Sequence, residues 1–315
     1  MPEPLGPASL AWQRGGDWRT ILMSLWAGSM QNMHPQLGAG VEEHSNFFDE
    51  RWQRLYRSIY PILGMIYDGP RAPETARQVR DYHRTIHGVD KHGQRYSALN
   101  PDTFFWAHCT FVMVPILTYE HFGVPYTAAE KEQAWTEGLQ WWALYGINKH
   151  DVPTDWASFE RYWDDMCTNV LEDNQATRDV LDIARIAKPP ALSWLPDRMW
   201  RVLRIPVSRG FVWITVGMYP DAVRGRLGFH WTRRDEIALR TAGRAVRMTW
   251  RLVPPERRYH PRARDAWRRA HGRTPAEAPL VETPARNLPP LQHRADPKHY
   301  VSAAPSGVVQ SGGST

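Results

Sequence analysis

Signals that begin α-helices recur along this chain, and each is followed by apolar residues at helical spacing. Residues 100–102, Asn-Pro-Asp, combine a capping side chain, a proline suited to the first turn and an acid that favours a helix N-terminus. They predict a helix through about His121. Residues 127–130, Thr-Ala-Ala-Glu, form a capping box for the next helix. Strand signals are scarce, the best being residues 211–215, so the predicted fold class is all-α.

Other segments show the same periodicity and indicate how the domain is organised. We expect further helices over residues 18–26, from Ser45 with a kink at Pro61, from Pro73 to Ile86 with a stop at Gly88, from Thr154 or Asp155, and over residues 193–203 and 232–252. The sequence therefore predicts a single multi-helix globular domain over residues 15–273. We expect a flexible N-terminus over residues 1–14 and a disordered tail, rich in Pro, Ala, Ser and Gly, over residues 274–315.

The 315-residue chain has the composition of a soluble globular protein, with 42% hydrophobic and 23% charged residues. No stretch reaches the roughly 18 to 20 uninterrupted apolar residues that a spanning helix needs, because residues 104–119 contain His108 and Pro115. The first residues show no basic segment followed by an apolar one, so we expect a cytoplasmic protein. Cys109 and Cys167 lie outside any zinc-binding spacing and are expected as buried thiols without a disulfide.

Positive charge is concentrated toward the C-terminal end of the predicted domain. Residues 198–273 hold 19 Arg and no Lys against 5 acids, whereas the remainder has 20 basic and 28 acidic residues. The two parts attract each other, and a solvated helical face docked on the acidic part is the favoured interpretation. An anionic membrane surface and a nucleic acid are alternative partners. Because no nucleic-acid reader motif accompanies the charge, nucleic acid is not expected.

Two histidines lie on apolar faces of different predicted helices. A helical wheel places His83 beside Val79 and Ile86, away from the neighbouring arginines. His108 is flanked at helical spacing by aromatic and aliphatic residues. A lone histidine on such a face is more often a hydrogen-bonded core residue than a ligand. Two of them on separate helices favour a cofactor pocket without naming the cofactor.

Other polar residues are weaker candidates. Arg54, Arg57 and Ser58 share one helix face, where a solvated or salt-bridged edge is the simplest interpretation. Residues 31–45 contain several His and Glu residues, yet the sequence has no HExxH or paired ExxH motif, which disfavours a classical non-haem metal site. It also lacks GxSxG, GxxxxGK[ST] and a GxGxxG after a strand, which disfavours elbow-type hydrolases, P-loop NTPases and Rossmann dehydrogenases.

A succession of short segments runs along residues 15–270. The segments are residues 17–19 (DWR), Gln31, residues 34–35 (HP), 40–45 (GVEEHS), 54–58 (RLYRS), 82–88 (YHRTIHG), 96–101 (YSALNP), 105–108 (FWAH), 119–123 (YEHFG) and 217–231. In this order they resemble the catalytic domain of the MpaB/rubber oxygenase (latex clearing protein-like) family. The resemblance implies an all-helical fold that holds haem b in a pocket between helices.

The resemblance also implies roles for individual residues. In the family, the haem iron is bound by a histidine in a His-x-x-x-x-Gly pattern, which here is His83, five residues before Gly88. Arg54, Arg57 and Ser58 would line the open face of the iron. Rubber-cleaving members carry a lysine ligand near the second of these positions, whereas the guanidinium of Arg57 has no lone pair to give to iron. Arg57 is therefore expected to donate hydrogen bonds to dioxygen or to a haem propionate.

Four more residues are nominated on the same basis. Gln31 and His34 are expected at the cofactor pocket, and His108 is expected in the pocket or as the alternative iron ligand. Glu43, with Glu42 beside it, is the nearest carboxylate for a base that removes an allylic proton.

The implied activity is that of a haem b-dependent oxygenase. It would use dioxygen to cleave or oxygenate a double bond of a lipophilic, isoprenoid-like alkene, with an electron donor as a partner that the sequence leaves open. The 16 Trp and 12 Tyr suit an apolar channel, although they suit a large core almost as well. The alternative is a non-enzymatic haem-binding or peripheral membrane protein that docks through the Arg-rich segment.

Overall fold

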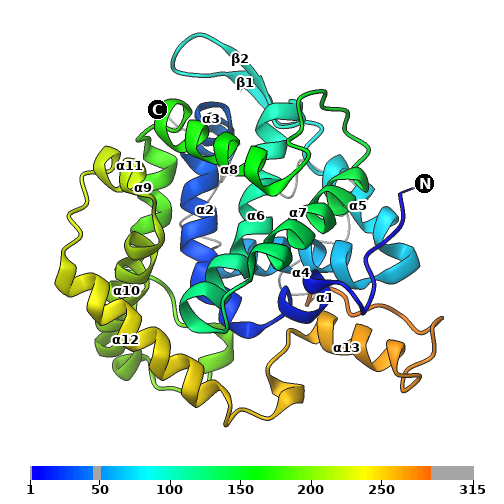
Figure 1. Cartoon of the computed structure of the whole chain (residues 1–315). Helices are drawn as coiled ribbons and strands as arrows, with labels where there is room; N and C mark the ends of the chain where they lie inside the picture. The colour runs from blue at the N-terminus through cyan, green and yellow to red at the C-terminus, as the bar shows by residue number, and fades with distance from the viewer. Residues whose placement is uncertain (1, 45–50, 285–315) are drawn as a thin grey trace, which may run out of the picture.

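The computed structural model describes residues 2–44 and 51–284 and confirms the all-α fold (Figure 1). Its α-helices are α1 (Leu10–Arg14), α2 (Ser24–Asn32), α3 (Pro35–His44), α4 (Arg51–Tyr67), α5 (Ala72–Asp81), α6 (Pro101–Phe122), α7 (Ala128–Ala143), α8 (Trp156–Asp165), α9 (Gln175–Leu181), α10 (Asp197–Met218), α11 (Asp221–Arg226), α12 (Arg233–Trp250) and α13 (Pro261–Ala270). Shorter elements connect them: η1 (Trp18–Met23), η2 (Gly69–Arg71), η3 (Met166–Val170), η4 (Pro190–Leu192), η5 (Pro255–Arg257), β1 (His87–Val89) and β2 (Arg95–Ser97).

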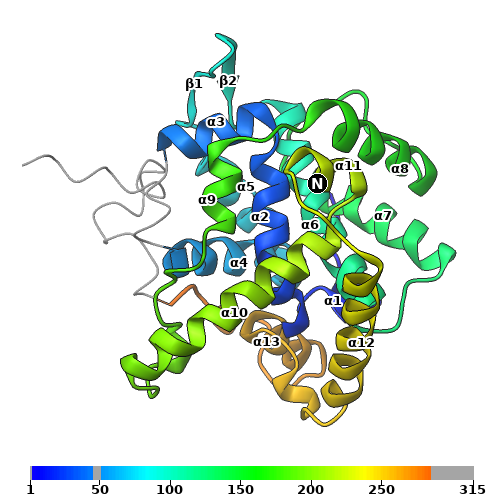
Figure 2. The ribbon, with the colours of Figure 1, turned by 90° about the vertical axis from the view of Figure 1, so that its left-hand side faces the viewer.

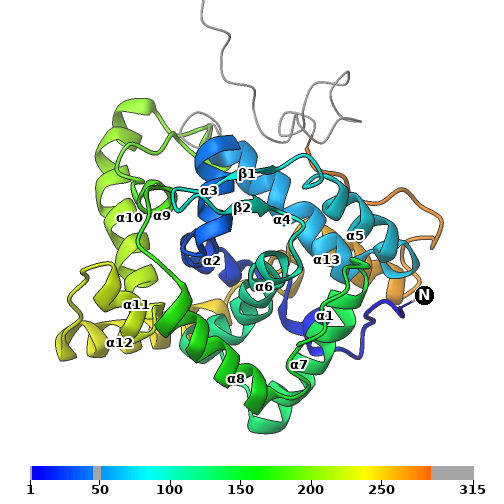
Figure 3. The same ribbon diagram turned by 90° about the horizontal axis from the view of Figure 1, so that it is seen from above.

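Helix α6 runs through the middle of the molecule. Its sequence is apolar around the whole circumference, which is typical of a buried helix. The Asn100 side chain caps it by accepting from the backbone N–H groups of Asp102 and Thr103. The helix packs against η1, α2, α7 and α12, and the view from above shows it surrounded by other helices (Figure 3). The helix predicted from residues 100–102 is therefore confirmed.

Local capping fixes where several other helices begin. The capping box predicted at residues 127–130 opens α7: the Thr127 hydroxyl accepts from the Glu130 N–H, and the Glu130 carboxylate accepts from the Thr127 N–H. Asp155, one of the two expected caps, begins α8. Thr232 begins α12 through a capping box of its own. These starts depend on residues close in sequence, so they are readable before the fold is known.

The end of α5 differs from the sequence prediction. The helix ends at Asp81 rather than Ile86, and turns lead from it into β1. Strand β1 pairs antiparallel with β2 across a turn in which Gly93 adopts a positive φ of 75°. This pairing draws residues 87–89 out of the helical path, although the apolar spacing continues to Ile86.

Two further expectations are corrected. Residues 211–215, the best strand signal, lie inside α10, where buried Ser208 and Thr215 recur at a seven-residue spacing on one helix face. Residues 18–26 form a 3₁₀ helix followed by α2 rather than one helix. The side chain of Asp17 caps η1 by accepting from the Arg19 N–H at 2.8 Å.

Two hydrophobic clusters form the core, and α6 contributes to both. The first draws on α1, α4, α5, α7, α8 and α13, and the second draws on η1, α2, η3 and α9–α12. Cys109 lies in the first cluster and Cys167 in the second, and both are free and buried as predicted.

Both ends of the described chain are tied to the core. Residues 10–14, which we expected to be flexible, form α1, because Leu10 and Trp12 are buried and the Trp12 indole donates to the Ile66 carbonyl at 2.6 Å. The Arg269 guanidinium donates to four carbonyls between residues 275 and 279, which holds the first part of the expected tail against α13. Residues 285–315 and the expected cap Ser45 lie outside the described residues. Within residues 2–44 and 51–284, no helix is long and apolar enough to cross a bilayer.

Candidate cofactor and substrate cavity

A cavity of about 780 Å³ lies among α2, α3, α4, α6, α7 and α10 and is lined mainly by apolar residues. This volume falls in the range of roughly 300–1,000 Å³ that is typical of cofactor and small-molecule sites. Its wall includes members of both hydrophobic clusters, such as Phe104 and Val112 of the first and Met23 and Ala27 of the second. A small set of polar side chains interrupts this apolar wall, and their positions decide what the cavity can bind.

His83 lines the cavity from the turn that follows α5. In a continued α-helix the backbone N–H of His83 would donate to the Val79 carbonyl, but here it donates to the Arg80 carbonyl at 3.0 Å. The Val79 carbonyl oxygen is contacted by the His83 ring instead, with Nδ1 at 2.8 Å. Because a carbonyl can only accept, Nδ1 carries the proton. The early end of α5 therefore fixes the tautomer of the histidine.

The surroundings of His83 keep its ring neutral and hold it in place. Burial lowers the pKa of His83 below its ordinary value, against the raising effect of the bond to Val79. Phe104 of α6 packs against the ring edge-to-face, with centroids 5.5 Å apart. A neutral ring protonated on Nδ1 keeps its lone pair on Nε2. A ring nitrogen held by a backbone carbonyl opposite a free lone pair is the usual arrangement of a metal-binding histidine.

Helix α4 brings the predicted polar group of Arg54, Arg57 and Ser58 to the same cavity. All three line it, as their shared helix face predicts. Arg57 is buried, with 5% of its surface exposed, whereas Ser58 is exposed. A buried guanidinium beside an apolar cavity places a permanent positive charge and several N–H donors at its wall.

His108 and Gln31 also line the cavity, but their side chains are engaged differently. His108 Nε2 lies 2.9 Å from the Gly138 carbonyl, and burial lowers the pKa of His108 to about 3. Its Nδ1 is buried and has no hydrogen-bond partner among the described residues. Gln31 donates from Nε2 to the Thr110 hydroxyl at 2.7 Å. His108 is 1% exposed, so a ligand could reach its ring only after the wall moved.

The structure does not bring His34 and Glu43 to the cavity wall. His34 is buried between α2 and α3, where burial lowers its pKa to about 4. Glu43 is exposed on α3 and accepts a hydrogen bond of 2.5 Å from the Tyr96 hydroxyl of β2. Glu42 accepts from the Ala176 N–H of α9 at 2.9 Å. Both carboxylates thus accept hydrogen bonds from neighbouring elements of the fold, and the role of Glu43 as a base stays a prediction.

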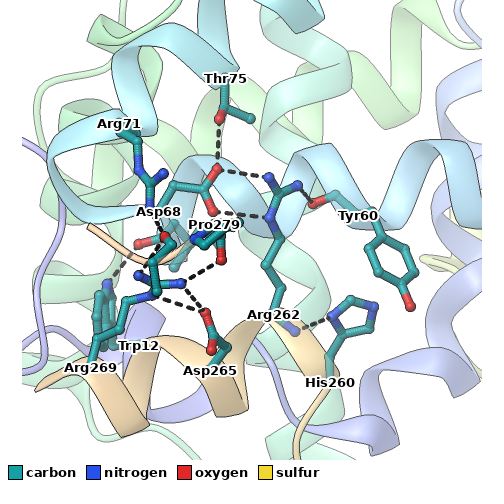
Figure 4. Close-up of polar contacts among 12 residues, drawn as sticks. Trp12, Tyr60, Asp68, Arg71, Thr75, His260, Arg262, Asp265, Arg269 and Pro279 are labelled. Carbon is teal, nitrogen blue, oxygen red and sulfur yellow. Dashed lines mark hydrogen bonds and ion pairs between the residues drawn. The ribbon is translucent and has the colours of Figure 1, made fainter. Parts of the chain in front are cut away.

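His260 also lines this cavity, although no sequence signal pointed to it. It precedes α13, about 180 residues after His83, and accepts at Nδ1 from the Arg262 N–H at 3.2 Å. Its ring packs edge-to-face on Tyr60, with centroids 4.4 Å apart. Beside it, Arg262 binds Asp68 through two hydrogen bonds of 2.9 Å (Figure 4). A histidine before a proline indicates a helix start, but only the tertiary packing of α13 on α4 brings it to the cavity.

The available donors fit a metal whose remaining ligands come from a macrocycle. No group of three His, Cys, Asp or Glu side chains that could hold a metal converges anywhere in residues 2–44 and 51–284. His83 offers a single nitrogen ligand at an apolar cavity large enough for a flat aromatic cofactor. Cationic Arg54 and Arg57 offer partners for carboxylate groups such as haem propionates. The residues present therefore fit haem.

The fold and the cavity define a class of protein: helical, with a large apolar cavity between helices, a neutral histidine in its wall and arginines beside it. Over residues 12–248 the chain matches the family described as ER-bound oxygenase mpaB/B'/Rubber oxygenase, catalytic domain, and it belongs to that family. The resemblance in the sequence is thereby confirmed, and membership indicates an oxygenase, which is an oxidoreductase. No curated protein and no solved structure matches the chain.

Proposed function

We propose that this protein is a haem b-dependent oxygenase in which His83 Nε2 binds the haem iron. The observation that carries the proposal is the 2.8 Å contact between His83 Nδ1 and the Val79 carbonyl. This bond holds the ring at the cavity wall and leaves Nε2 as the nitrogen with a lone pair. Bound haem supplies the redox chemistry toward dioxygen.

Residues of α4 provide further polar groups in the cavity wall. Arg57 stays protonated and cannot bind iron, so it acts as a hydrogen-bond donor to dioxygen or to a propionate. Arg54 and Ser58 lie on the same face of the helix and extend this polar strip. In an apolar cavity a buried cation interacts more strongly with a developing negative charge than it would in water.

The apolar wall favours a lipophilic alkene as substrate. Cleavage of its carbon–carbon double bond by one dioxygen gives two carbonyl groups, with one oxygen atom in each. The carbon–carbon bond and the oxygen–oxygen bond break, two carbon–oxygen double bonds form, and no external electron is consumed in the net reaction. The net reaction would therefore consume no electron donor.

Haem content tests the ligand assignment without any assay of turnover. Protein expressed with haem supplementation is expected to give a stoichiometric b-type spectrum and pyridine haemochrome, and His83→Ala is expected to lose them. His87→Ala is the matched control, because His87 is an exposed histidine four residues away on β1. Imidazole added to His83→Gly should restore the spectrum if the ring acts as a ligand. Full haem content in His83→Ala would overturn the assignment, and loss only in His108→Ala would transfer it to His108.

Arg57→Lys tests the polar residues that α4 contributes to the cavity wall. A lysine amine can lose its proton and bind iron, so this variant is expected to show a six-coordinate spectrum that grows with pH and slower reaction with dioxygen. An unchanged ferrous spectrum and unchanged dioxygen binding would place Arg57 away from the iron.

Turnover is tested with lipophilic alkenes and labelled dioxygen. Substrate-dependent dioxygen uptake with label in both carbonyl products supports cleavage, whereas label in a single oxygenated product supports a monooxygenase reaction that consumes reductant. Stoichiometric haem without alkene-dependent uptake across a panel of isoprenoids would favour a non-enzymatic haem-binding protein and overturn the oxygenase proposal.

A further inference from the structure

The first half of α10 and the residue Trp194 before it form an exposed surface that is both apolar and basic. Of the eleven large hydrophobic side chains that are exposed among the described residues, six lie within residues 194–207. Val202 is 70% exposed and Trp194 is 74% exposed. Figure 2 shows this half of α10 projecting from the helical body. We call the surface formed by Trp194, Arg198, Met199, Arg201, Val202, Ile205 and Arg209 the α10 face.

The opposite side of the same helix is anchored to the protein. Trp200 is buried, and its indole donates to the Ile186 carbonyl at 3.1 Å. Ser208, two turns further on, is also buried and donates to the Ile183 carbonyl at 2.8 Å. These contacts fix the rotation of the helix, so Val202 and Ile205 point away from the segment that Trp200 and Ser208 contact.

Charge in the segment that carries the α10 face is mainly positive. Residues 183–220 contain six basic residues and one acid, Asp197. That acid is paired with Lys188 at 2.6 Å, so its charge is already compensated. Arg198, Arg201 and Arg209 are exposed and form no ion pair with another described residue. Aliphatic side chains and exposed arginines on one helix, with an exposed tryptophan just before it, are features of segments that lie in the interface of an anionic membrane.

Two occupants from the chain itself are disfavoured by charge. A second copy of this face, paired by two-fold symmetry, would bring like charges together. Residues 285–315 contain Arg286, Arg294 and Lys298 against Asp296 alone, so they carry the same sign as the α10 face. We propose that the α10 face docks on a lipid bilayer that contains anionic headgroups, with its apolar side chains in the interface and its arginines on the headgroups.

The docked helix would also form part of the wall between the bilayer and the cavity. Trp200, Val207 and Phe211 of α10 line the cavity, together with Pro189 and Leu192 of the preceding segment. A lipophilic substrate dissolved in the bilayer would then reach the cavity without crossing water. This consequence rests on the proposed function, whereas the docking itself does not.

Vesicle flotation tests the docking. The full chain is expected to float with phosphatidylcholine vesicles that contain phosphatidylglycerol, and to float less with pure phosphatidylcholine or as salt shortens the reach of the charges. Replacing Trp194, Val202 and Ile205 together by Ser should reduce partitioning at least about tenfold. Serine at Ile237, Met248 and Leu252, which are equally exposed on and after α12, is the matched control and should leave partitioning unchanged.

Charge variants give a second readout. Arg198→Gln and Arg201→Gln should each weaken binding to anionic vesicles by about fivefold, whereas Arg234→Gln and Arg244→Gln, exposed on α12, should not. If the α10 and α12 arginine variants lost vesicle binding equally, overall charge would govern binding. If the two serine triple variants lost it equally, protein stability would. Either result would overturn the proposal.

A probe on α10 reports contact with the lipid directly. Because Cys109 and Cys167 are buried, an environment-sensitive fluorophore can be attached to Val202→Cys, with Leu252→Cys as the control. A blue shift on anionic vesicles is expected at position 202 only. A different outcome is that the fluorophore at position 202 shows no blue shift while the protein self-associates or binds nucleic acid, and the serine variant of Trp194, Val202 and Ile205 abolishes that binding. This combination would assign the α10 face to a different partner. Haem content measured on the same samples separates this outcome from a failure of the proposed function.

Discussion

The ion pair between Asp68 and Arg262 gives a quantitative prediction for the stability of the fold. Arg262, in the first turn of α13, binds both carboxylate oxygens of Asp68 at 2.9 Å and donates to the Tyr60 carbonyl at 2.6 Å (Figure 4). Thr75 of α5 donates to the same carboxylate at 2.6 Å. The Asp68 side chain has no exposed surface, so the pair joins α13 to α4 and α5 in the interior.

Arg262→Met removes three of these hydrogen bonds and leaves the buried Asp68 carboxylate with Thr75 as its one side-chain hydrogen-bond partner among the described residues. Breaking a buried pair in this way costs about 3–5 kcal/mol of unfolding free energy, because the remaining charge is uncompensated. Replacing both residues, as Asp68→Leu with Arg262→Met, should cost much less than the sum of the single changes, since no charge is left behind. Arg264→Met, at an exposed position of the same helix, should change stability by less than about 0.5 kcal/mol.

Urea unfolding followed by far-ultraviolet circular dichroism measures these free energies at fixed haem content. The pH adds an independent check. Burial raises the pKa of Asp68, and Arg262 opposes that effect, so Arg262→Met should raise the pKa further. A carboxyl whose pKa is raised in the folded state is destabilising above that pKa and less so below it, so the deficit of the variant should shrink as the pH falls. A loss below about 1 kcal/mol at pH 8, or a deficit that grows in acid, would refute the reasoning.

Three further predictions concern other buried contacts. Burial lowers the pKa of both His108 and His260 to about 3. Each histidine should therefore cost about 1.4 kcal/mol of unfolding free energy per pH unit as the pH falls below about 6.5, its pKa in the unfolded chain. His260→Asn should lessen this pH dependence, measured by urea unfolding between pH 7.5 and 5. A Cβ at Gly243 would lie 2.2 Å from a backbone carbonyl oxygen of α6, so Gly243→Ala should destabilise the fold by about 1–3 kcal/mol. A Cβ at Gly210 of α10 would lie in open space, so Gly210→Ala should stabilise the fold by about 0.5–1 kcal/mol. Thermal unfolding measures both effects. The Glu137 carboxylate accepts two backbone N–H groups of α1 at 2.9 Å each, so Glu137→Gln should cost about 1–3 kcal/mol and speed proteolysis of the first residues; unchanged proteolysis would argue against this contact as the anchor.

The parts of the fold that the sequence predicts well are those decided by neighbouring residues. The caps at Asn100, Thr127 and Asp155 bond to N–H groups two or three positions away, so their signals are complete within a few residues. The end of α5 is different. The helical periodicity runs on to Ile86, but pairing between β1 and β2 decides the path of the chain, and a short hairpin leaves little trace in composition.

The candidate site shows the same division. The cavity is lined together by Arg54, Arg57 and Ser58 because they share one face of α4. Their spacing in the sequence predicts this shared face directly. The resemblance selects His83, but the bond that fixes its ring depends on the helix ending early, which the wheel did not predict. Glu43, the nearest carboxylate in the sequence, accepts a hydrogen bond from Tyr96 and does not line the cavity, and sequence position alone does not show where its side chain lies. His260 was missed because only tertiary contacts place α13 beside α4.

The cavity has a consequence for how much of this protein a cell contains. Its wall is shared by the two hydrophobic clusters, so a molecule that fills it adds contacts to both at once. A ligand that binds only the folded chain stabilises it by RT ln(1 + [L]/Kd), about 2.7 kcal/mol at a hundredfold excess over Kd. Newly made chains that meet no ligand therefore unfold more often and are exposed to proteases. The steady-state level of the protein would follow the supply of the molecule that fills the cavity, without any dedicated sensor.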